Sequence, residues 1–166
     1  MGLEFDIKII PFDKGYEPTK EEIKTEIKNI VSGLLELGEF YSSPLEKEMK
    51  EIPEKEVLEY FDSPMEKNYV FSFDLTKTLS SGDYPNEEET WGYFYPKWDS
   101  KLNELQLNAA STSLIRICKE WENSEKFLNK VFEIIAKKTE CKKVALWNDH
   151  SDNVDDYDIV YEYEKN

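Results

Sequence analysis

The chain begins with a regular alternation of apolar and charged residues. The apolar members, which continue up to Pro11, are Leu3, Phe5, Ile7 and Ile9. A period of two places every second side chain on the same face of a strand. We therefore predict that the chain opens with a strand that has one buried face.

A helical repeat follows. Residues 19–22 read Thr-Lys-Glu-Glu, which has the form of a capping box, and apolar residues then recur every three or four positions up to Gly38. These apolar positions are Ile23, Ile27, Ile30, Val31, Leu34 and Leu35. The pattern predicts a helix from Thr19 to Leu37. Prolines interrupt residues 39–66, where we predict only a short helix from Glu54 to Phe61.

Aromatic residues dominate the middle of the chain. Large side chains alternate with smaller or polar ones over residues 68–79, and residues 90–95 form a second aromatic run. The segment between them is acidic and rich in turn-forming residues, which is typical of a long β-hairpin. A third strand at residues 104–107 would extend the hairpin into an antiparallel meander.

The last third of the chain predicts helices and then strands. We expect one helix over residues 113–121 and a second one that is capped by Ser124 and ends near Lys137 and Lys138. Residues 144–147 and 159–163 have the composition of strands. There is no internal repeat. The prediction is one α+β domain over residues 1–166, with a mostly antiparallel sheet and three to four helices.

Composition narrows the class of protein. The 166 residues are 39% hydrophobic and 14% aromatic, so the chain should fold. Cys118 and Cys141 lack CxxC spacing and predict neither a disulfide framework nor a zinc site. The first residues do not resemble a secretory signal and no long apolar run follows, so we expect a cytoplasmic protein without membrane contact. Arg116 is the single arginine, which disfavours direct nucleic-acid binding.

Charge is the most informative property of the sequence. The formal net charge is −15, divided into −8 over residues 1–82, −4 over 83–100, +3 over 101–147 and −6 over 148–166. Repulsion among like charges destabilises a folded domain, but it keeps the protein soluble and steers it toward a basic partner. The imbalance therefore favours a protein that meets a cationic macromolecule.

Motifs of catalysis and cofactor binding are lacking. His150 is the single histidine, and a catalytic set would pair it with Cys118, Ser111 or Ser113, yet no nucleophile elbow or cysteine-protease signature accompanies it. The six glycines form no phosphate-binding loop. We therefore expect no cofactor and no enzymatic activity. A small enzyme that uses His150 and nearby carboxylates is the alternative.

Five aspartates between residues 149 and 158 suggest a cation site, because Ca²⁺ prefers oxygen ligands. The spacing does not fit an EF-hand loop that starts at Asp149. Val154 then stands where glycine is required, and Val160 stands at the position of the closing glutamate. We expect a solvated acidic turn with no metal, and a weak cation site is the alternative.

Acidic and aromatic residues adjoin one another over residues 83–99. Tyrosine and tryptophan are frequent anchors at protein interfaces, and carboxylates pair with arginine and lysine of a basic partner. The alternative is a hairpin whose rings point into the core while its acidic tip stays solvated. The expected partner-binding residues are Asp83, Glu87, Glu88, Glu89, Trp91, Tyr93, Asp149, Asp152, Asp155 and Asp156.

In size, acidity and composition the chain resembles the bacterial immunity proteins that neutralise toxins of interbacterial competition. The resemblance implies an inhibitor of a cognate, basic toxin domain, often a nuclease, that would dock by electrostatic steering and aromatic anchors. An alternative is a nucleic-acid mimic that inhibits a DNA-binding enzyme, although the positive segment 101–147 counts against a uniformly acidic surface.

Overall fold

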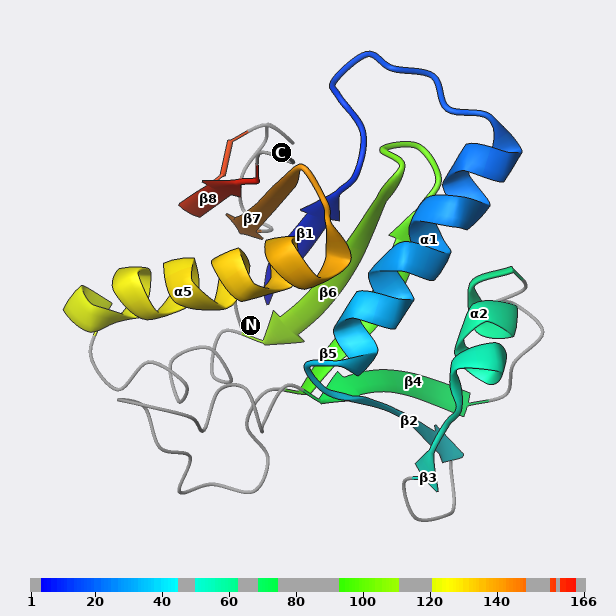
Figure 1. Ribbon diagram of the computed structural model, residues 1–166. Coiled ribbons are helices and arrows are strands. Elements are labelled where there is room, and N and C mark those ends of the chain that lie inside the picture. Colours follow the sequence, from blue (N-terminus) through cyan, green and yellow to red (C-terminus); the bar gives the residue numbers. More distant parts are fainter. Residues whose placement is uncertain are drawn as a thin grey trace.

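The computed structural model describes residues 4–44, 50–62, 69–74, 93–110, 121–148, 156–157 and 159–163. Helices and strands alternate irregularly along this part of the chain (Figure 1). In chain order they are β1 (Glu4–Ile10), α1 (Lys20–Leu35), β2 (Glu39–Pro44), β3 (Lys50–Glu51), α2 (Glu54–Asp62), β4 (Tyr69–Asp74), β5 (Tyr93–Asp99), β6 (Glu104–Ala110), α5 (Trp121–Thr139), β7 (Lys143–Asn148) and β8 (Ile159–Glu162).

The strands form an 8-stranded sheet in the order β3-β2-β4-β5-β6-β1-β7-β8, and every neighbouring pair is antiparallel. Strands β4, β5 and β6 make the expected meander. The N-terminal strand β1 lies between β6 and β7, so it joins the meander to the C-terminal strands β7 and β8. The α+β class with an antiparallel sheet is confirmed.

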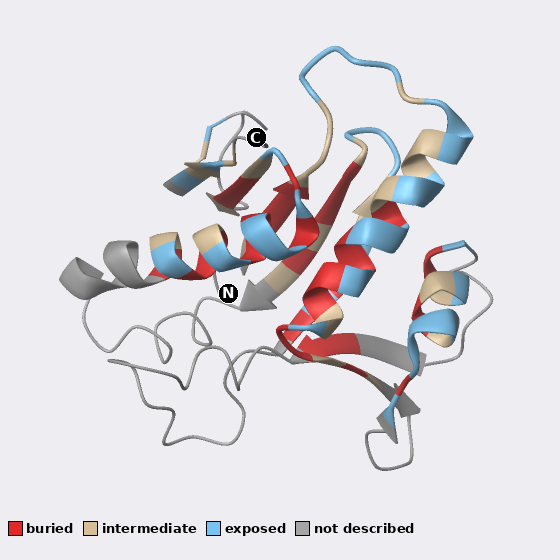
Figure 2. Cartoon of the chain, in the orientation of Figure 1, coloured by how far each residue is buried: buried red, intermediate tan, exposed pale blue. Residues whose placement is uncertain are grey.

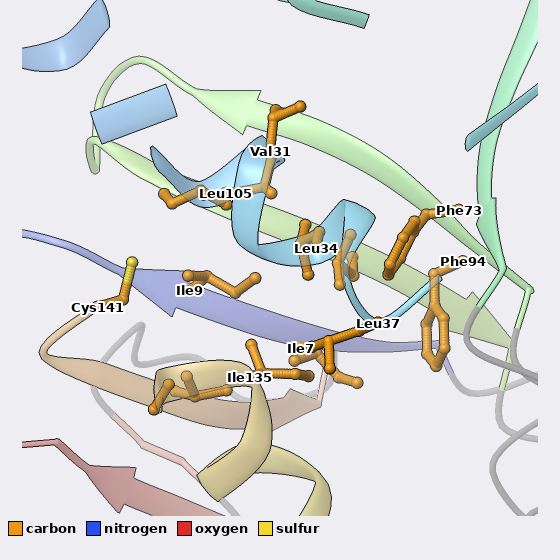
Figure 3. Close-up of a cluster of buried hydrophobic side chains, with 14 of the residues drawn as sticks. Ile7, Ile9, Val31, Leu34, Leu37, Phe73, Phe94, Leu105, Ile135 and Cys141 are labelled. Atoms are coloured by element: carbon orange, nitrogen blue, oxygen red, sulfur yellow. The ribbon is translucent and has the colours of Figure 1, made fainter. Parts of the chain in front are cut away.

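One face of the sheet forms the core. In β1, Ile7 lies between Leu107 and Leu146 of the neighbouring strands, and all three side chains are buried. Helices α1 and α5 cover this face. Their apolar sides are buried against the sheet (red in Figure 2), whereas their outer sides are exposed. Figure 3 shows Leu34 of α1 and Ile135 of α5 directed toward the side chain of Ile7.

The sheet changes direction within β5. Tyr93 and Phe94 pair with β4, whereas residues 95–99 pair with β6. Pro96 follows the change of partner, and a proline in a strand is tolerated where the hydrogen-bond ladder is interrupted. Strands β2 and β4 therefore run at an angle to β6 and β1 (Figure 1). The rings of Phe40 and Phe73 fill this corner, with centroids 4.6 Å apart.

Helix α1 begins and packs as its sequence requires. Thr19 accepts a hydrogen bond from the backbone N–H of Glu22, and the Glu22 carboxylate accepts one from the N–H of Thr19. This capping box satisfies two helix-end donors. Farther along, Gly33 lets α1 approach the end of α5, because a Cβ there would lie 2.4 Å from the carbonyl oxygen of Lys138.

Most expected elements are confirmed, and several boundaries are corrected. Helix α5 begins at Trp121, so Ser124 lies inside the helix and is not its cap. The second hairpin strand, expected over 90–95, extends to Asp99, since it continues into the pairing with β6, and residues 90–92 lie outside the described residues. Strands β2 and β3 were missed, because residues 39–51 have no clear alternation. The helix expected over 113–121 lies outside the described residues, apart from Trp121.

Candidate functional site

Most of the expected partner-binding residues lie outside the described part of the chain. This holds for Asp83, Glu87, Glu88, Glu89, Trp91, Asp149, Asp152 and Asp155, and also for Cys118 and His150. Tyr93 begins β5 opposite Asp74, and Asp156 is exposed shortly before β8. Strands β6, β1 and β7 separate β5 from β8, so the structure does not bring Tyr93 and Asp156 into one site.

The described end of the aromatic segment points to both sides of the sheet. Phe94 is buried in the core, and Trp98 packs against the same core from a partly buried position. Tyr95, between them in the alternation, is 54% exposed. At its described end the segment thus has rings in the core and one ring in solvent, and the expected role of its rings as partner anchors stays a prediction.

A cavity of about 890 Å³ lies at one end of the sheet. Its walls are the β1–α1 connection (residues 12–18), the β5–β6 turn (100–103), the adjoining ends of β7 and β8, and Tyr157. The connection is the blue loop that arches above the sheet in Figure 1. The volume lies within the range of small-ligand sites, about 300–1,000 Å³, so this cavity is the strongest candidate binding site in the described structure.

Side-chain contacts hold the arched wall in place. The ammonium of Lys142 forms an ion pair with Asp13, and the rings of Phe12 and Tyr16 stack with centroids 5.8 Å apart. The Tyr16 hydroxyl donates to the Glu22 carboxylate over 2.9 Å, and this hydrogen bond raises the pKa of Tyr16 above its ordinary value of 10.0. The arch is therefore tied to Lys142, the residue before β7, and to α1.

An ion pair is buried beneath the cavity. Lys8 Nζ lies 2.9 Å from Glu104 Oε1, and the two side chains are only 2% and 5% exposed. The same ammonium lies 4.7 Å from the ring centroid of Trp147, and Gln106 donates a hydrogen bond to Glu104. Burying two charges is costly unless they pair well and are hydrogen-bonded, and here both conditions are met. The negative charge of Glu104, which lines the cavity, is therefore neutralised by the ammonium of Lys8.

The opposite wall holds a second cation against a ring. Lys143 Nζ lies 4.6 Å from the ring centroid of Tyr157, a cation–π distance. Lys143 also lies opposite Glu162 in the β7–β8 register. The Tyr157 ring thus holds this ammonium at the edge of the cavity, and the Glu162 carboxylate is not within ion-pair distance of it.

The charge of the cavity lining differs from that of the whole chain. Four carboxylates (Asp13, Glu17, Glu104 and Glu162) and four ammonium groups (Lys14, Lys101, Lys142 and Lys143) line it, so the local formal charge is zero. The chain as a whole carries −15. Lys8, which is buried next to Glu104, adds one positive charge, so the cavity does not share the acidic excess of the chain.

A second feature is the outer side of α2, which we call the acidic helix surface and define by Glu54, Glu59 and Asp62. All three are exposed, and within the described chain none of them has an ammonium at ion-pair distance. Asp62 ends the helix, where a negative charge opposes the helix dipole. Glu54 lies in the first turn, where a negative charge favours the helix, so Asp62 is the member of this surface that opposes helix stability.

The described residues offer little catalytic chemistry. They contain no group of three or more histidine, cysteine or acidic side chains that would hold a metal ion. Burial raises the pKa of the Cys141 thiol to about 12, which keeps it protonated and unreactive. Within the same residues no helix is long and apolar enough to cross a membrane.

Sequence reasoning missed both the cavity and the acidic helix surface. The cavity joins segments that are up to about 150 residues apart in the chain, such as Phe12 and Tyr163, and no local pattern predicts their meeting. The acidic helix surface left a signal, because four of the nine residues of α2 are acidic and one is basic. That signal was hidden by the high acidity of the whole chain.

Comparisons with known proteins return no relative. No protein-family model, curated protein or solved structure gives a significant match to this chain. The function must therefore be argued from the charge and geometry of the chain itself.

Proposed function

We propose that this protein is an inhibitor of the immunity type, which binds and neutralises a basic bacterial toxin domain, in the first place a nuclease. The acidic helix surface is the observation that carries the proposal. Its three carboxylates are exposed and have no internal counter-ion among the described residues, so they are free to pair with arginine and lysine of a partner.

The ion pairs that the lysines form within the chain support this proposal. Lys137, Lys138 and Lys142 form surface ion pairs with acids of the same chain, and Lys8 is buried with Glu104. Cations are thus partly neutralised within the fold, while the carboxylates of α2 are not. Lys55 is also exposed among these acids on α2, so a basic partner meets a surface with a formal charge of −2 over these four residues.

The mechanism has two stages. The net charge of −15 accelerates the encounter with a cationic domain, an effect that can reach about 10–10³-fold in on-rate at low salt. Carboxylates then occupy positions that the phosphates of a nucleic-acid substrate would take in the toxin, and aromatic side chains anchor the complex. The toxin is blocked because its substrate can no longer reach it.

A co-expression experiment tests the proposal. A gene for a large secreted toxin immediately upstream of this gene would supply the candidate domain. We expect cells that express this domain to stop growing, and to recover when this chain is co-expressed. Failure of the chain to restore growth, with both proteins produced in soluble form, would refute the proposal for that toxin.

A triple variant of α2 distinguishes a loss of docking from a loss of folding. Replacing Glu54, Glu59 and Asp62 together by their amides removes three charges from exposed positions, so the fold should be kept. We expect this variant to protect cells less well than the original chain. As a matched control, the triple variant Glu21→Gln, Glu36→Gln and Glu51→Gln loses three other exposed carboxylates and should protect nearly as well.

A further inference from the structure

Strand β8 forms one edge of the sheet. Within the described part of the chain it pairs with β7 alone, which lies on one side of it (Figure 1). An edge strand presents a row of backbone N–H and C=O groups to which a further strand can bind. The other side of β8 is therefore a candidate docking surface for an extended chain.

The pairing of β7 with β8 shows which backbone groups of this edge face outward. The N–H of Tyr163 donates to the carbonyl of Lys142 over 2.7 Å, so Tyr163 and, by alternation, Tyr161 turn their backbone groups toward β7. Val160 and Glu162 consequently turn their N–H and C=O groups away from β7. Among the described residues these outward groups have no hydrogen-bond partner.

The side chains of β8 anchor one face of the strand and leave the other face accessible. Tyr161 and Tyr163 pack against the core on the side of α5. Val160 is 40% exposed, and Glu162 is exposed without an ion-pair partner in the described structure. Because the tyrosines already hold β8 in place, an added strand does not have to order it.

Charge decides between a second copy of this chain and a different protein as the source of the added strand. Residues 155–165 carry five carboxylates and one ammonium, a formal charge of −4. Counting Lys143 of β7 still leaves −3, and the neighbouring Lys137 and Lys142 are each paired with an acid of the chain. A second copy would place the same acids against each other, whereas a basic segment would be attracted.

We infer that the β8 edge binds an extended basic segment of another protein as an added antiparallel strand. Main-chain groups of this segment exchange hydrogen bonds with Val160 and Glu162. The residue opposite Glu162 is a lysine or arginine, and the residue two positions farther along, opposite Val160, is apolar. The inference goes beyond the proposed function, because β8 and β3 are the two end strands of the sheet and α2 follows β3, far from β8 (Figure 1).

Hydrogen exchange on the full chain tests the inference. The probe is the capped heptapeptide Ser-Thr-Lys-Ile-Val-Thr-Ser, whose lysine is designed to lie opposite Glu162 and whose valine is designed to lie opposite Val160. We expect the amides of Val160 and Glu162 to exchange rapidly in the free protein, and about tenfold or more slowly with saturating peptide. The amide of Tyr161, which faces β7, should change little.

N-methylated peptides distinguish strand pairing from other modes of binding. Methyl groups on the lysine and valine nitrogens block the two donors that face β8, and should weaken binding by at least about tenfold. The matched control carries its methyl groups on isoleucine and on the threonine after valine, whose nitrogens face away from β8, and should lose less than about threefold. Replacing the lysine of the probe by glutamate should weaken binding by about threefold or more at low salt.

Substitutions in the protein test the same contact. Val160→Pro removes an outward N–H but keeps the pairing with β7, because proline is tolerated at a strand edge. We expect it to weaken binding by at least about fivefold, whereas Val160→Thr, which keeps the N–H, should stay within about twofold. Urea denaturation checks that both variants fold. Glu162→Lys provides a second test, since it should favour the glutamate peptide over the lysine peptide.

Several outcomes would overturn the inference. They are slow exchange of the Val160 and Glu162 amides in the free protein, no binding of the lysine peptide, and equal binding of the two methylated peptides. Sedimentation that shows a dimer, which Val160→Pro dissociates, would assign the edge to a second copy instead. If the peptide does not bind but the chain protects cells from the toxin, only this inference fails; if the peptide binds and protection fails, only the proposed function fails.

Discussion

Lys8 and Glu104 form an ion pair of 2.9 Å that is almost completely buried on the face of the sheet opposite the helices. Lys8 follows Ile7 in β1 and precedes Ile9, so the alternation that buries the two isoleucines in the core places the ammonium on the other face. Glu104 begins the neighbouring strand β6 and lines the cavity. The pair thus joins the centre of the sheet to the candidate binding site.

The first prediction concerns this pair. Lys8→Met should lower the free energy of unfolding by about 3–5 kcal/mol, because it leaves the carboxylate of Glu104 buried without a counter-ion. Urea denaturation measures the change. The double variant Lys8→Met with Glu104→Leu should recover much of the loss, since no charge then remains buried. A double variant as unstable as Lys8→Met alone would contradict this account of the pair.

A second prediction concerns the contact between α1 and α5. Gly33→Ala should destabilise the fold by about 1–3 kcal/mol, although alanine favours a helix, because the new Cβ would lie 2.4 Å from the carbonyl oxygen of Lys138 and force the helices apart. Thermal unfolding provides the measurement. Ser32→Ala, at the exposed neighbouring position, should be close to neutral; an equally neutral Gly33→Ala would show that the helices separate easily.

Much of the fold was predictable, because its elements carry strong local signals. The capping box at Thr19 and the apolar spacing after it located α1, and the alternation around Ile7 located β1. In β5 the prediction was only partly right. The aromatic run indicated a strand, but its exchange of partners between Phe94 and Tyr95 depends on β6, which local sequence does not show.

The candidate site was less predictable for a physical reason. Alternation places Lys8 on a polar face, and only the assembled structure reveals that this face is closed over it. Tyr157 lies in the acidic segment that suggested a cation site, yet its ring holds Lys143 of the preceding strand. Burial and pairing between distant segments decide the chemistry here, and neither has a sequence motif.

The third prediction concerns the pH dependence of Cys141. Its pKa is raised from 9.0 to about 12 by burial, so at pH 8 only about one thiol in ten thousand is ionised in the folded protein. In a Cys118→Ser variant, we expect negligible reaction with a disulfide reagent at pH 8 until urea unfolds the chain. Rapid reaction of the folded variant would show that Cys141 is accessible.

The same pKa shift makes stability depend on pH. Above pH 9 the unfolded chain releases the Cys141 proton while the folded protein keeps it, so this residue's contribution to stability is lost as the pH rises from 9 toward 12. The loss approaches about 1.4 kcal/mol per pH unit. Comparing urea denaturation of the protein and of Cys141→Ala between pH 8 and 10 isolates it, and identical pH profiles would argue against it.

The fourth prediction concerns the wall of the cavity. Glu22→Gln should lower the pKa of Tyr16 toward 10.0, because the hydrogen bond and the negative charge that oppose ionisation of the phenol are both weakened. Ultraviolet or NMR titration of Tyr16 measures the shift. An unchanged titration would mean that Tyr16 does not contact Glu22 in solution, and that the arch is not tied to α1.

We propose that this acidic chain docks on a basic protein through the exposed carboxylates of α2. The most direct measurement is the association rate constant with the toxin domain encoded beside its gene, determined at 0.05 M and 0.3 M salt. We predict a fall of about tenfold or more between the two, and a smaller fall when Glu54, Glu59 and Asp62 are all replaced by amides. An association rate that does not depend on salt or on these three residues, or no complex at low salt, would contradict the account.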